Sequence, residues 1–338
     1  MTLEAIAAPE NLLLAAAKAR RGKSRRPDVE DWWQRRETQV LRLSDELASG
    51  TWRPAGYRFF EIHEPKRRMI AAAPFADRVV HHALCNVMQP ALERRFIARS
   101  FSCQVGKGTT AARECCRKLV NQHSYVLKCD VRRFFPSLDH EVLMRKLASV
   151  IRCAAVLRLC RVIVDSHHTA DRPNRCGLPI GNLTSQIWGN FYLDALDHQI
   201  TEAEEHGAYL RYTDDFLTFS NDKRRLWELR EVISTSLEAV HLELHTPKTR
   251  ILQSTEGVPF CGFRFLPGLR PRVLGPTKRR FRHRTNLLCK QGAPSAIVTA
   301  ATFAWYQFSR EGNTHGLRKA WAINRTPKIS IGTGKCEA

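Results

Sequence analysis

The sequence lacks the features of several common classes of protein. Its longest apolar stretch, Ala296 to Trp305, is about half the length of a membrane-spanning helix. The apolar run from Leu12 to Ala17 has no basic segment before it and follows Glu4 and Glu10, so it does not have the form of a secretory signal peptide. There is no internal repeat and no low-complexity tract. We therefore expect a globular, cytoplasmic chain that does not associate with membranes.

The cysteines and histidines show no metal-binding pattern. Eleven cysteines are scattered along the chain without a C-x-x-C pair, which argues against zinc fingers and a disulfide scaffold and favours a reducing cytosol. The doublets His81-His82 and His167-His168 have no Cys or carboxylate companions at ligand spacing. The segment Gly106 to Thr109 lacks the Ser or Thr that follows the lysine in a Walker motif, so we do not expect an ATPase loop.

Acidic residues are scarce relative to basic ones. The chain of 338 residues has 54 Lys and Arg against 33 Asp and Glu, a formal net charge of +21. Such a balance indicates a polyanionic partner. Residues 267–338 carry fourteen of the cations and only two acids. Within them, the run from Lys278 to Arg284 interleaves cations with Phe281, as expected of a surface that lies along a phosphate backbone; a solvated helix face is the alternative.

The apolar periodicity predicts a mixed α and β chain. An alternating run at 124–131 predicts a strand that places Asp130 at its end, and two β-type runs, AYLRYT and FLTFS, meet at Asp214 and Asp215 as in a hairpin. Together with the intervening helices they predict a βαββαβ-like sheet within an α+β fold. The other predicted elements are helices within residues 1–50, 79–88, 140–151, 152–166, 183–200 and 226–240 and strands at 57–62, 68–73 and 241–245.

Three acids form the main candidate site. Asp130 follows one apolar strand, and Asp214 and Asp215 form the predicted hairpin tip. Like charges held together destabilise a fold unless a cation neutralises them, and carboxylate oxygens are ligands that suit Mg²⁺. The spacing therefore favours a divalent-metal site, with ordinary surface acids as the alternative.

Six segments resemble the ordered motifs of reverse transcriptases. Each alone could arise by chance, but all six stand in the expected order, between about residue 57 and residue 265. They are KRRMIAAAPFADRVVHHAL with Arg68 and Asp77, KCDVRRFFPSLD with Asp130, GLPIGNLTSQ before the helix at 183–200, RYTDDF, LELHTPKT with Lys248, and FCGFRF.

This resemblance implies an RNA-directed DNA polymerase with the right-hand architecture. Residues 1–123 would form an N-terminal extension and the fingers, which continue in part into 140–180. Residues 124–266 would form most of the palm, and 267–338 a basic helical thumb and a tail. The substrates would be template RNA, the cDNA/RNA hybrid and deoxynucleoside triphosphates.

The resemblance also implies a role for each motif residue. Asp130 and Asp214, with Val131 beside them, would hold two Mg²⁺ ions about 4 Å apart, and Asp215 would be a lesser ligand. Phe135 would lie under the sugar of the incoming nucleotide, while Phe134 would point to the opposite face and belong to the core. The other implied roles are nucleotide binding by Lys66, Arg68, Ile180 and Lys248, and nucleic-acid binding by Gln186, Lys278, Arg279, Arg280 and Arg282.

Within this class, GLPIGNLTSQ is most similar to reverse transcriptases of diversity-generating retroelements. These enzymes copy an RNA template with errors at adenines and supply variable cDNA to a target gene. The resemblance implies a structured template RNA and a small basic accessory protein that forms a ring. Two departures from the wider family are Thr213, where Met or Ala is commoner, and Ile180, where Gln is usual. The alternatives are an antiphage-defence reverse transcriptase and a non-catalytic RNA-binding protein on the same fold.

Overall fold

The chain forms two compact units. The computed structural model describes residues 1–63, 67–167 and 175–321. The first unit consists of Met1–Cys115 and Tyr125–Ile251, and the second of Cys116–Ser124 and the residues from Leu252 onward. Within the described ranges, no helix has the length and apolar character needed to cross a membrane.

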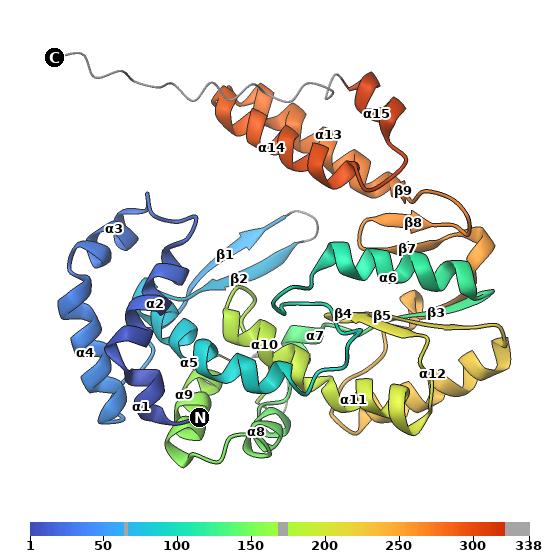
Figure 1. Ribbon diagram of the computed structural model, residues 1–338. Coiled ribbons are helices and arrows are strands. Elements are labelled where there is room, and N and C mark those ends of the chain that lie inside the picture. The colour runs from blue at the N-terminus through green and yellow to red at the C-terminus, as the bar shows by residue number, and fades with distance from the viewer. Residues whose placement is uncertain (64–66, 168–174, 322–338) are drawn as a thin grey trace. The chain divides into compact units, whose positions relative to one another are not determined.

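The first three helices of the chain pack against the long fifth helix in the first unit, and the fourth packs against those three (Figure 1). One face of the second helix and one face of the fifth are buried, as helical spacing predicts, whereas Leu13 and Leu14 of the second helix are exposed. Trp32 packs edge-on against Phe75, and the guanidinium groups of Arg20 and Arg36 both lie near the Trp33 ring. The helices are α1 (Leu3–Ala7), α2 (Pro9–Arg20), α3 (Pro27–Gln34), α4 (Arg36–Ala48) and α5 (Phe75–Glu93).

An antiparallel hairpin precedes α5. Its strands are β1 (Arg58–Ile62) and β2 (Arg68–Ala72), with Phe60 opposite Ile70, and both confirm the predicted strands. Arg68 is exposed at the start of β2. Lys66 lies outside the described residues.

A sheet with the strand order β4-β5-β3-β6 forms the centre of the candidate site. The strand β3 (Tyr125–Asp130) pairs antiparallel with β5 (Asp215–Ser220), which also pairs antiparallel with β4 (Tyr209–Tyr212). The helix α12 (Lys223–Glu238) packs against β3 and β5 through its apolar face, Leu226, Leu229, Ile233 and Leu237. The α+β class predicted from the sequence is confirmed.

The helical predictions in the middle of the chain are confirmed, with one subdivision. The predicted helix at 183–200 consists of three pieces, α10 (Leu183–Tyr192), α11 (Asp194–His198) and a π-helical turn at Gln199–Ala203. The others are α6 (Thr109–Gln122), which begins after the glycine-rich turn, α7 (Phe134–Ser137), α8 (His140–Ala148) and α9 (Ala154–Asp165).

The strand predicted at 241–245 is wrong. Only Leu244 forms a bridge, with Val131, and the chain then turns through a 3-10 helix at Thr246–Lys248 before β6 (Arg250–Gln253). His241, the first residue of this segment, has a left-handed φ of +58°, which interrupts an extended strand, and Pro247 after the segment has no N–H to donate.

The second unit contains a small sheet and three helices. The strands β7 (Val258–Phe260) and β8 (Phe263–Phe265) form the predicted FCGFRF hairpin, and β9 (Arg272–Val273) pairs with β8. The hairpin turns at Cys261 and Gly262, both with positive φ (41° and 87°), as a two-residue turn between twisted strands requires. The helices are α13 (Gly275–Lys290), α14 (Ser295–Ser309) and α15 (His315–Ala320).

Candidate active site

The structure brings the three predicted carboxylates together. Asp130, the last residue of β3, pairs directly with Asp215, the first residue of β5. Asp214 lies in the turn before β5, and its carbonyl oxygen accepts a hydrogen bond from the Val131 N–H at 3.3 Å. Because the N–H and C=O groups of an extended residue point to the same side of a strand, the Val131 carbonyl also faces this turn.

Two lysines neutralise part of this negative charge. The Nζ of Lys248 lies 2.5 Å from Oδ1 of Asp130, and Lys128 forms an ion pair with Asp215. Burial raises the pKa of Asp214, and the nearby charges of Asp130 and Asp215 raise it further. Burial also raises the pKa of Asp215, against the lowering effect of Lys128. The site is therefore one in which additional positive charge stabilises the ionised carboxylates.

The available donors suit a hard divalent cation. In the described part of the chain, no three His, Cys, Asp or Glu side chains are arranged as a group that could hold a metal ion, and Asp130 and Asp215 each face a lysine. The oxygens of Asp130, Asp214, Asp215 and the Val131 carbonyl are nevertheless all of the type that Mg²⁺ prefers. A cation bound by Asp130 would replace the Lys248 ammonium there.

A glycine-containing loop connects the β1–β2 hairpin to the other side of the site. The Ile180 carbonyl accepts a hydrogen bond from the Ala71 N–H of β2 at 3.3 Å, and the Leu178 N–H donates to the Phe135 carbonyl at 2.9 Å. Gly181 has a φ of +125°, and a Cβ there would lie 3.4 Å from the Ala71 carbonyl oxygen. Two predicted nucleotide-binding residues, Phe135 and Ile180, are thus held by one loop.

The predicted orientation of the two phenylalanines is wrong in one respect. Phe134 is buried, at 3% exposure, as a core residue should be, and Phe135 is partly exposed. However, their rings lie side by side with centroids 5.2 Å apart. A Cβ on Gly189 of α10 would lie 3.2 Å from each ring. This glycine leaves room for both rings. The two phenylalanine side chains therefore pack against the same face of α10 and do not point to opposite sides.

Gln186 lies on the exposed side of α10. Its Oε1 accepts a hydrogen bond from the Cys103 thiol at 3.3 Å. The side chain is therefore accessible, and its contact with nucleic acid remains a prediction.

Sequence reasoning missed a buried ionic network next to the turn that carries Asp214. Arg211 of β4 and Asp197 of α11 are fully buried and joined by two hydrogen bonds, of 2.7 and 2.5 Å. The remaining guanidinium donors bind the side chain and carbonyl of Asn190 and the carbonyl of Thr213, each at 3.1 Å. Tyr209 also donates to Asp197. A cation within the otherwise apolar strand run AYLRYT was the sequence signal for this network.

Comparison with known protein families agrees with this geometry. The family model described as reverse transcriptase (RNA-dependent DNA polymerase) matches residues 62–265. The chain belongs to the reverse transcriptase family. No curated protein matches the sequence.

Solved structures similar to this reverse transcriptase include two yeast telomerases. Telomerase from Candida albicans, in complex with the TWJ fragment of telomeric RNA, has a TM-score of 0.51 and 13% identity, covering 66% of this chain and 46% of that chain. Apo telomerase from Candida tropicalis has a TM-score of 0.50 and 12% identity, covering 63% and 47%. The chain thus spans about half the length of these telomerase chains, and the likeness concerns the fold alone.

Replacing Phe135 tests the predicted contact of this reverse transcriptase with the nucleotide sugar. We expect Phe135→Ala to raise ribonucleotide use relative to deoxyribonucleotide use by about tenfold or more, the equivalent of 1.4 kcal/mol, because a smaller side chain no longer clashes with a 2′-hydroxyl. The measurement is kcat/KM for both nucleotides in single-nucleotide extension.

Phe134→Ala is the matched control for Phe135→Ala. It removes an adjacent ring of the same size that is buried, so it should lower stability without changing sugar selectivity. Equal selectivity in the two variants would contradict the assignment of Phe135.

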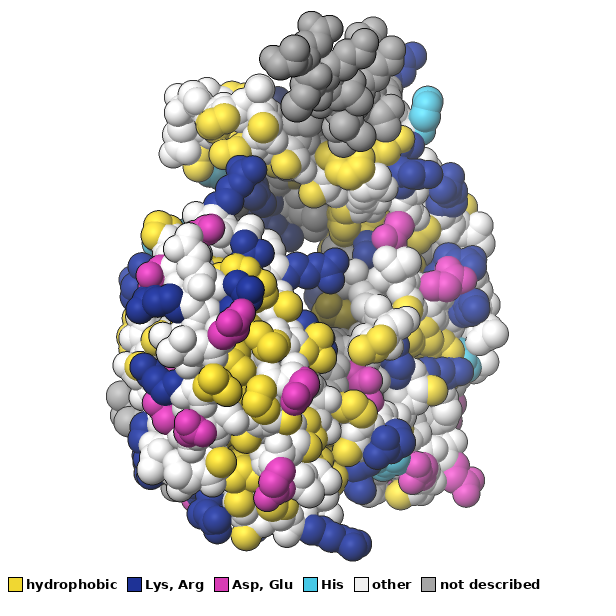
Figure 2. Space-filling model, turned by 60° about the vertical axis from the view of Figure 1, so that its left-hand side comes forward, with side chains coloured by type: hydrophobic (Ala, Val, Ile, Leu, Met, Phe, Trp, Pro, Cys, Tyr) yellow, Lys and Arg dark blue, Asp and Glu magenta, His cyan; other side chains and the backbone are white. Residues whose placement is uncertain are grey.

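The basic segment of the second unit lies in the first half of α13. Arg279, Arg280, Arg282 and Arg284 are exposed, and Lys278 is partly buried. The expectation that Phe281 lies on this basic surface is wrong: its ring stacks on Trp305 of α14, with centroids 4.4 Å apart and planes 8° from parallel. The aromatic residue therefore joins the two helices, while the cations face solvent. Cationic side chains are also spread over the molecular face seen in Figure 2, with fewer acidic ones between them.

Neutralising α13 should change the salt dependence of nucleic-acid binding. Each neutralised phosphate contributes a slope of roughly −0.7 to −0.9 in log affinity against log salt. We expect replacement of Lys278, Arg279, Arg280 and Arg282 by Gln to reduce the slope by about two to three units, measured on a primer-template hybrid. An unchanged slope would instead mean that α13 is a solvated face.

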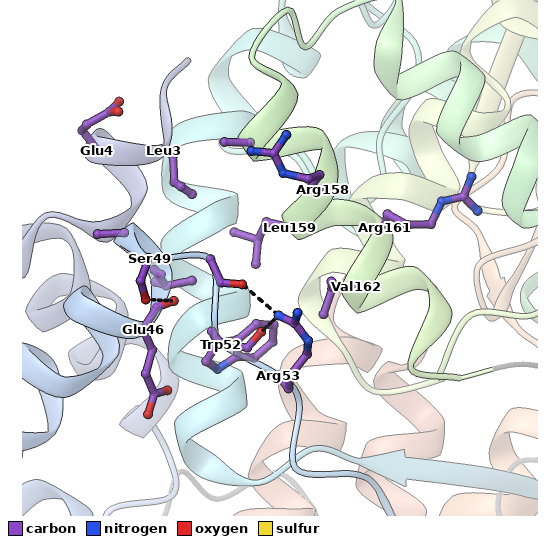
Figure 3. Close-up of a pocket in the computed structure, with 14 residues that line it drawn as sticks. Leu3, Glu4, Glu46, Ser49, Trp52, Arg53, Arg158, Leu159, Arg161 and Val162 are labelled. Carbon is purple, nitrogen blue, oxygen red and sulfur yellow. Dashed lines mark hydrogen bonds between the residues drawn. The ribbon is translucent and has the colours of Figure 1, made fainter.

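A separate pocket of about 440 Å³ lies among α1, α9 and the end of α4 (Figure 3). Leu3, Leu159, Val162 and Trp52 form its apolar lining, and Arg53 donates to the carbonyls of Gly50 and Trp52. It includes none of the predicted site residues, so it is distinct from the carboxylate site.

Proposed function

We propose that this chain is an RNA-directed DNA polymerase that makes cDNA from a structured template RNA by two-metal nucleotidyl transfer, within a diversity-generating retroelement. The observation that carries the catalytic part is the pairing of Asp130 with Asp215 beside Asp214. It provides carboxylate oxygens at rigid strand ends. In this proposal, the first unit supplies the fingers and palm, and α13 and α14 supply the thumb.

Each site residue has a separate task in this proposal. Asp130 and Asp214, with the Val131 carbonyl, would hold two Mg²⁺ ions, which when bound make the primer 3′-hydroxyl more acidic and neutralise the triphosphate. Asp215, which is paired with Lys128, is the lesser ligand in this proposal, as the resemblance to reverse transcriptases implies. Lys248 lies next to Asp130 and would stabilise the leaving pyrophosphate, and Arg68 would contact the triphosphate of the nucleotide.

The retroelement part of the proposal is supported by Ile180. Its backbone is held by β2, and its side chain is apolar, so it offers no hydrogen bond to check the nascent base pair. Error-prone synthesis at template adenines is consistent with this loss. The proposal includes deoxynucleoside triphosphates as substrates, a small basic accessory protein as partner and a cytoplasmic location.

Sequencing of cDNA tests the proposal. The enzyme is incubated with primed RNA templates, Mg²⁺ and all four deoxynucleotides, and errors are counted at each template base. We expect extension with errors concentrated opposite adenine. Extension with evenly distributed errors would favour the defence-enzyme alternative, and no extension would favour a non-catalytic RNA-binding protein.

Ile180→Gln should lower misincorporation opposite adenine more than it lowers correct extension. A net hydrogen bond is worth about 0.5 to 1.5 kcal/mol. Discrimination against the wrong nucleotide should therefore improve by a factor of about two to ten. Single-nucleotide extension on templates that differ only at the templating base provides the measurement. Ile180→Leu, which keeps the side chain apolar, is the control, and an unchanged error ratio in Ile180→Gln would contradict the role of this residue.

A further inference from the structure

The turn that carries Asp214 is held in a backbone conformation that its sequence disfavours. Thr213 and Asp214 form a two-residue turn between Tyr212 and Asp215, which pair with each other. Thr213 has a φ of +58°, a left-handed value. Glycine is preferred at the first position of such a turn, and a β-branched residue is poorly suited to it. Surrounding contacts must therefore hold Thr213 in place.

Two hydrogen bonds hold Thr213 from opposite ends. The Nη1 of Arg211 donates to the Thr213 carbonyl at 3.1 Å, and the Thr213 hydroxyl donates to Oγ of Ser102 at 2.8 Å. Ser102 is itself held by Asn190, whose side-chain amide donates to the Ser102 carbonyl at 2.5 Å. Both the backbone and the side chain of Thr213 are thus attached to other parts of the unit.

The anchor for these contacts is rigid. Arg211 is fully buried, and its charge is balanced by Asp197 within the network described above. Its backbone is also bonded to the segment at residues 99–101. The Arg211 N–H donates to the Arg99 carbonyl, and the Arg211 carbonyl accepts from the Phe101 N–H, both at 3.0 Å. A guanidinium held by this many partners has a single position available to it.

We propose that Arg211 and Ser102 are positioning residues that hold Thr213 in its left-handed conformation and thereby set the position of Asp214 for metal binding. This inference rests on the proposed function, because it takes Asp214 to be a metal ligand. Rotation about φ of Thr213 moves Asp214, the next residue, but leaves Asp130 on β3 in place. Metal affinity and turnover should therefore depend on this network, whereas nucleotide affinity should not, since Arg68, Phe135 and Ile180 lie on other elements.

The chain offers a matched pair of substitutions. Thr213→Val removes the hydroxyl that binds Ser102 and keeps the side-chain shape. Thr218→Val makes the same change on the same hairpin, at a fully buried residue whose hydroxyl has no hydrogen-bond partner among the described residues. Arg211→Lys is the second test variant, because it keeps the positive charge but loses the planar fork that reaches Thr213 and Asp197 together.

Three measurements on the full chain test the proposal. They are amide hydrogen exchange of residues 212–217 in metal-free enzyme, Mn²⁺ affinity measured by electron paramagnetic resonance, and kcat and KM for one deoxynucleotide. In Thr213→Val we expect faster exchange and weaker Mn²⁺ binding, each by about twofold to tenfold, the range of one net hydrogen bond. We expect kcat to fall and KM to stay unchanged, with larger effects of the same pattern in Arg211→Lys and none in Thr218→Val.

Two results would overturn the inference. One is a Thr213→Val variant that matches Thr218→Val in exchange or in Mn²⁺ affinity. The other is a rise in KM without a change in Mn²⁺ affinity, which would place the effect on nucleotide binding. If the wild-type enzyme bound no Mn²⁺, the proposed function would fail as well, and the exchange data would distinguish this case by still reporting a turn held by Ser102.

Discussion

Asp130→Ala and Asp214→Ala should each lower the rate of nucleotide addition by about a thousandfold or more. Metal stabilisation of a reacting phosphate is worth several kcal/mol, and each 1.36 kcal/mol is tenfold in rate. Each substitution removes a carboxylate at a strand end or turn and no core contact. The measurement is single-turnover extension of a primed RNA template at saturating Mg²⁺.

The same variants should remain folded. Burial and neighbouring negative charge both disfavour the ionised form of Asp214, so removal of its carboxyl relieves repulsion, and the thermal midpoint should stay the same or rise. Asp215→Asn is the graded control, with a smaller loss of rate, because Asp215 is the lesser ligand in the proposed site. Near-wild-type extension by either alanine variant would show that the metal ligands lie elsewhere.

Asp197→Ala should destabilise the protein by about 3 to 5 kcal/mol. It leaves the Arg211 guanidinium buried without a counter-charge, and breaking one side of a buried ion pair has a cost of this size. It also removes the acceptor of the Tyr209 hydroxyl. The measurement is the free energy of unfolding from urea titration.

A double variant separates the charge effect from simple loss of packing. Asp197→Leu combined with Arg211→Met removes both charges and keeps the volume apolar, so it should recover most of the lost stability. Glu243→Ala is a surface control, because Glu243 pairs with Arg132 in an exposed ion pair of little net value. A loss below about 1 kcal/mol in Asp197→Ala would mean that the network contributes no more than that surface pair.

The parts of the site that the sequence predicts well depend on local patterns. The strand ending at Asp130 and the hairpin at Asp214 follow from alternation of apolar residues over a few positions, and both form as expected. Once the strand and the hairpin pair, the acidic residues at their ends lie next to each other, and no contact with a third segment is needed to bring them together. This is why the candidate metal ligands could be named before the fold was known.

The parts that the sequence does not predict depend on contacts between distant segments. The burial of Arg211 depends on Asp197 and Asn190, which precede it on different helices. The side-by-side packing of Phe134 and Phe135 depends on Gly189 of α10. The strand expected at 241–245 has the right residue types, but His241 is left-handed and only Leu244 forms a bridge. In each case tertiary packing overrides the local preference.

The lysines that face Asp130 and Asp215 would make cation binding at the proposed site an ion exchange. A cation that arrived at Asp130 would displace the Lys248 ammonium, and Lys128 would remain as the counterion of Asp215. The negative charge of the carboxylates is thus balanced by cations both before and after the exchange. The protein therefore does not need a bound metal ion in order to fold. The protein should consequently stay folded in the presence of chelator, with its thermal midpoint lowered only by the loss of the binding free energy of the ion, in contrast to small metal-dependent domains that unfold when the ion is withdrawn.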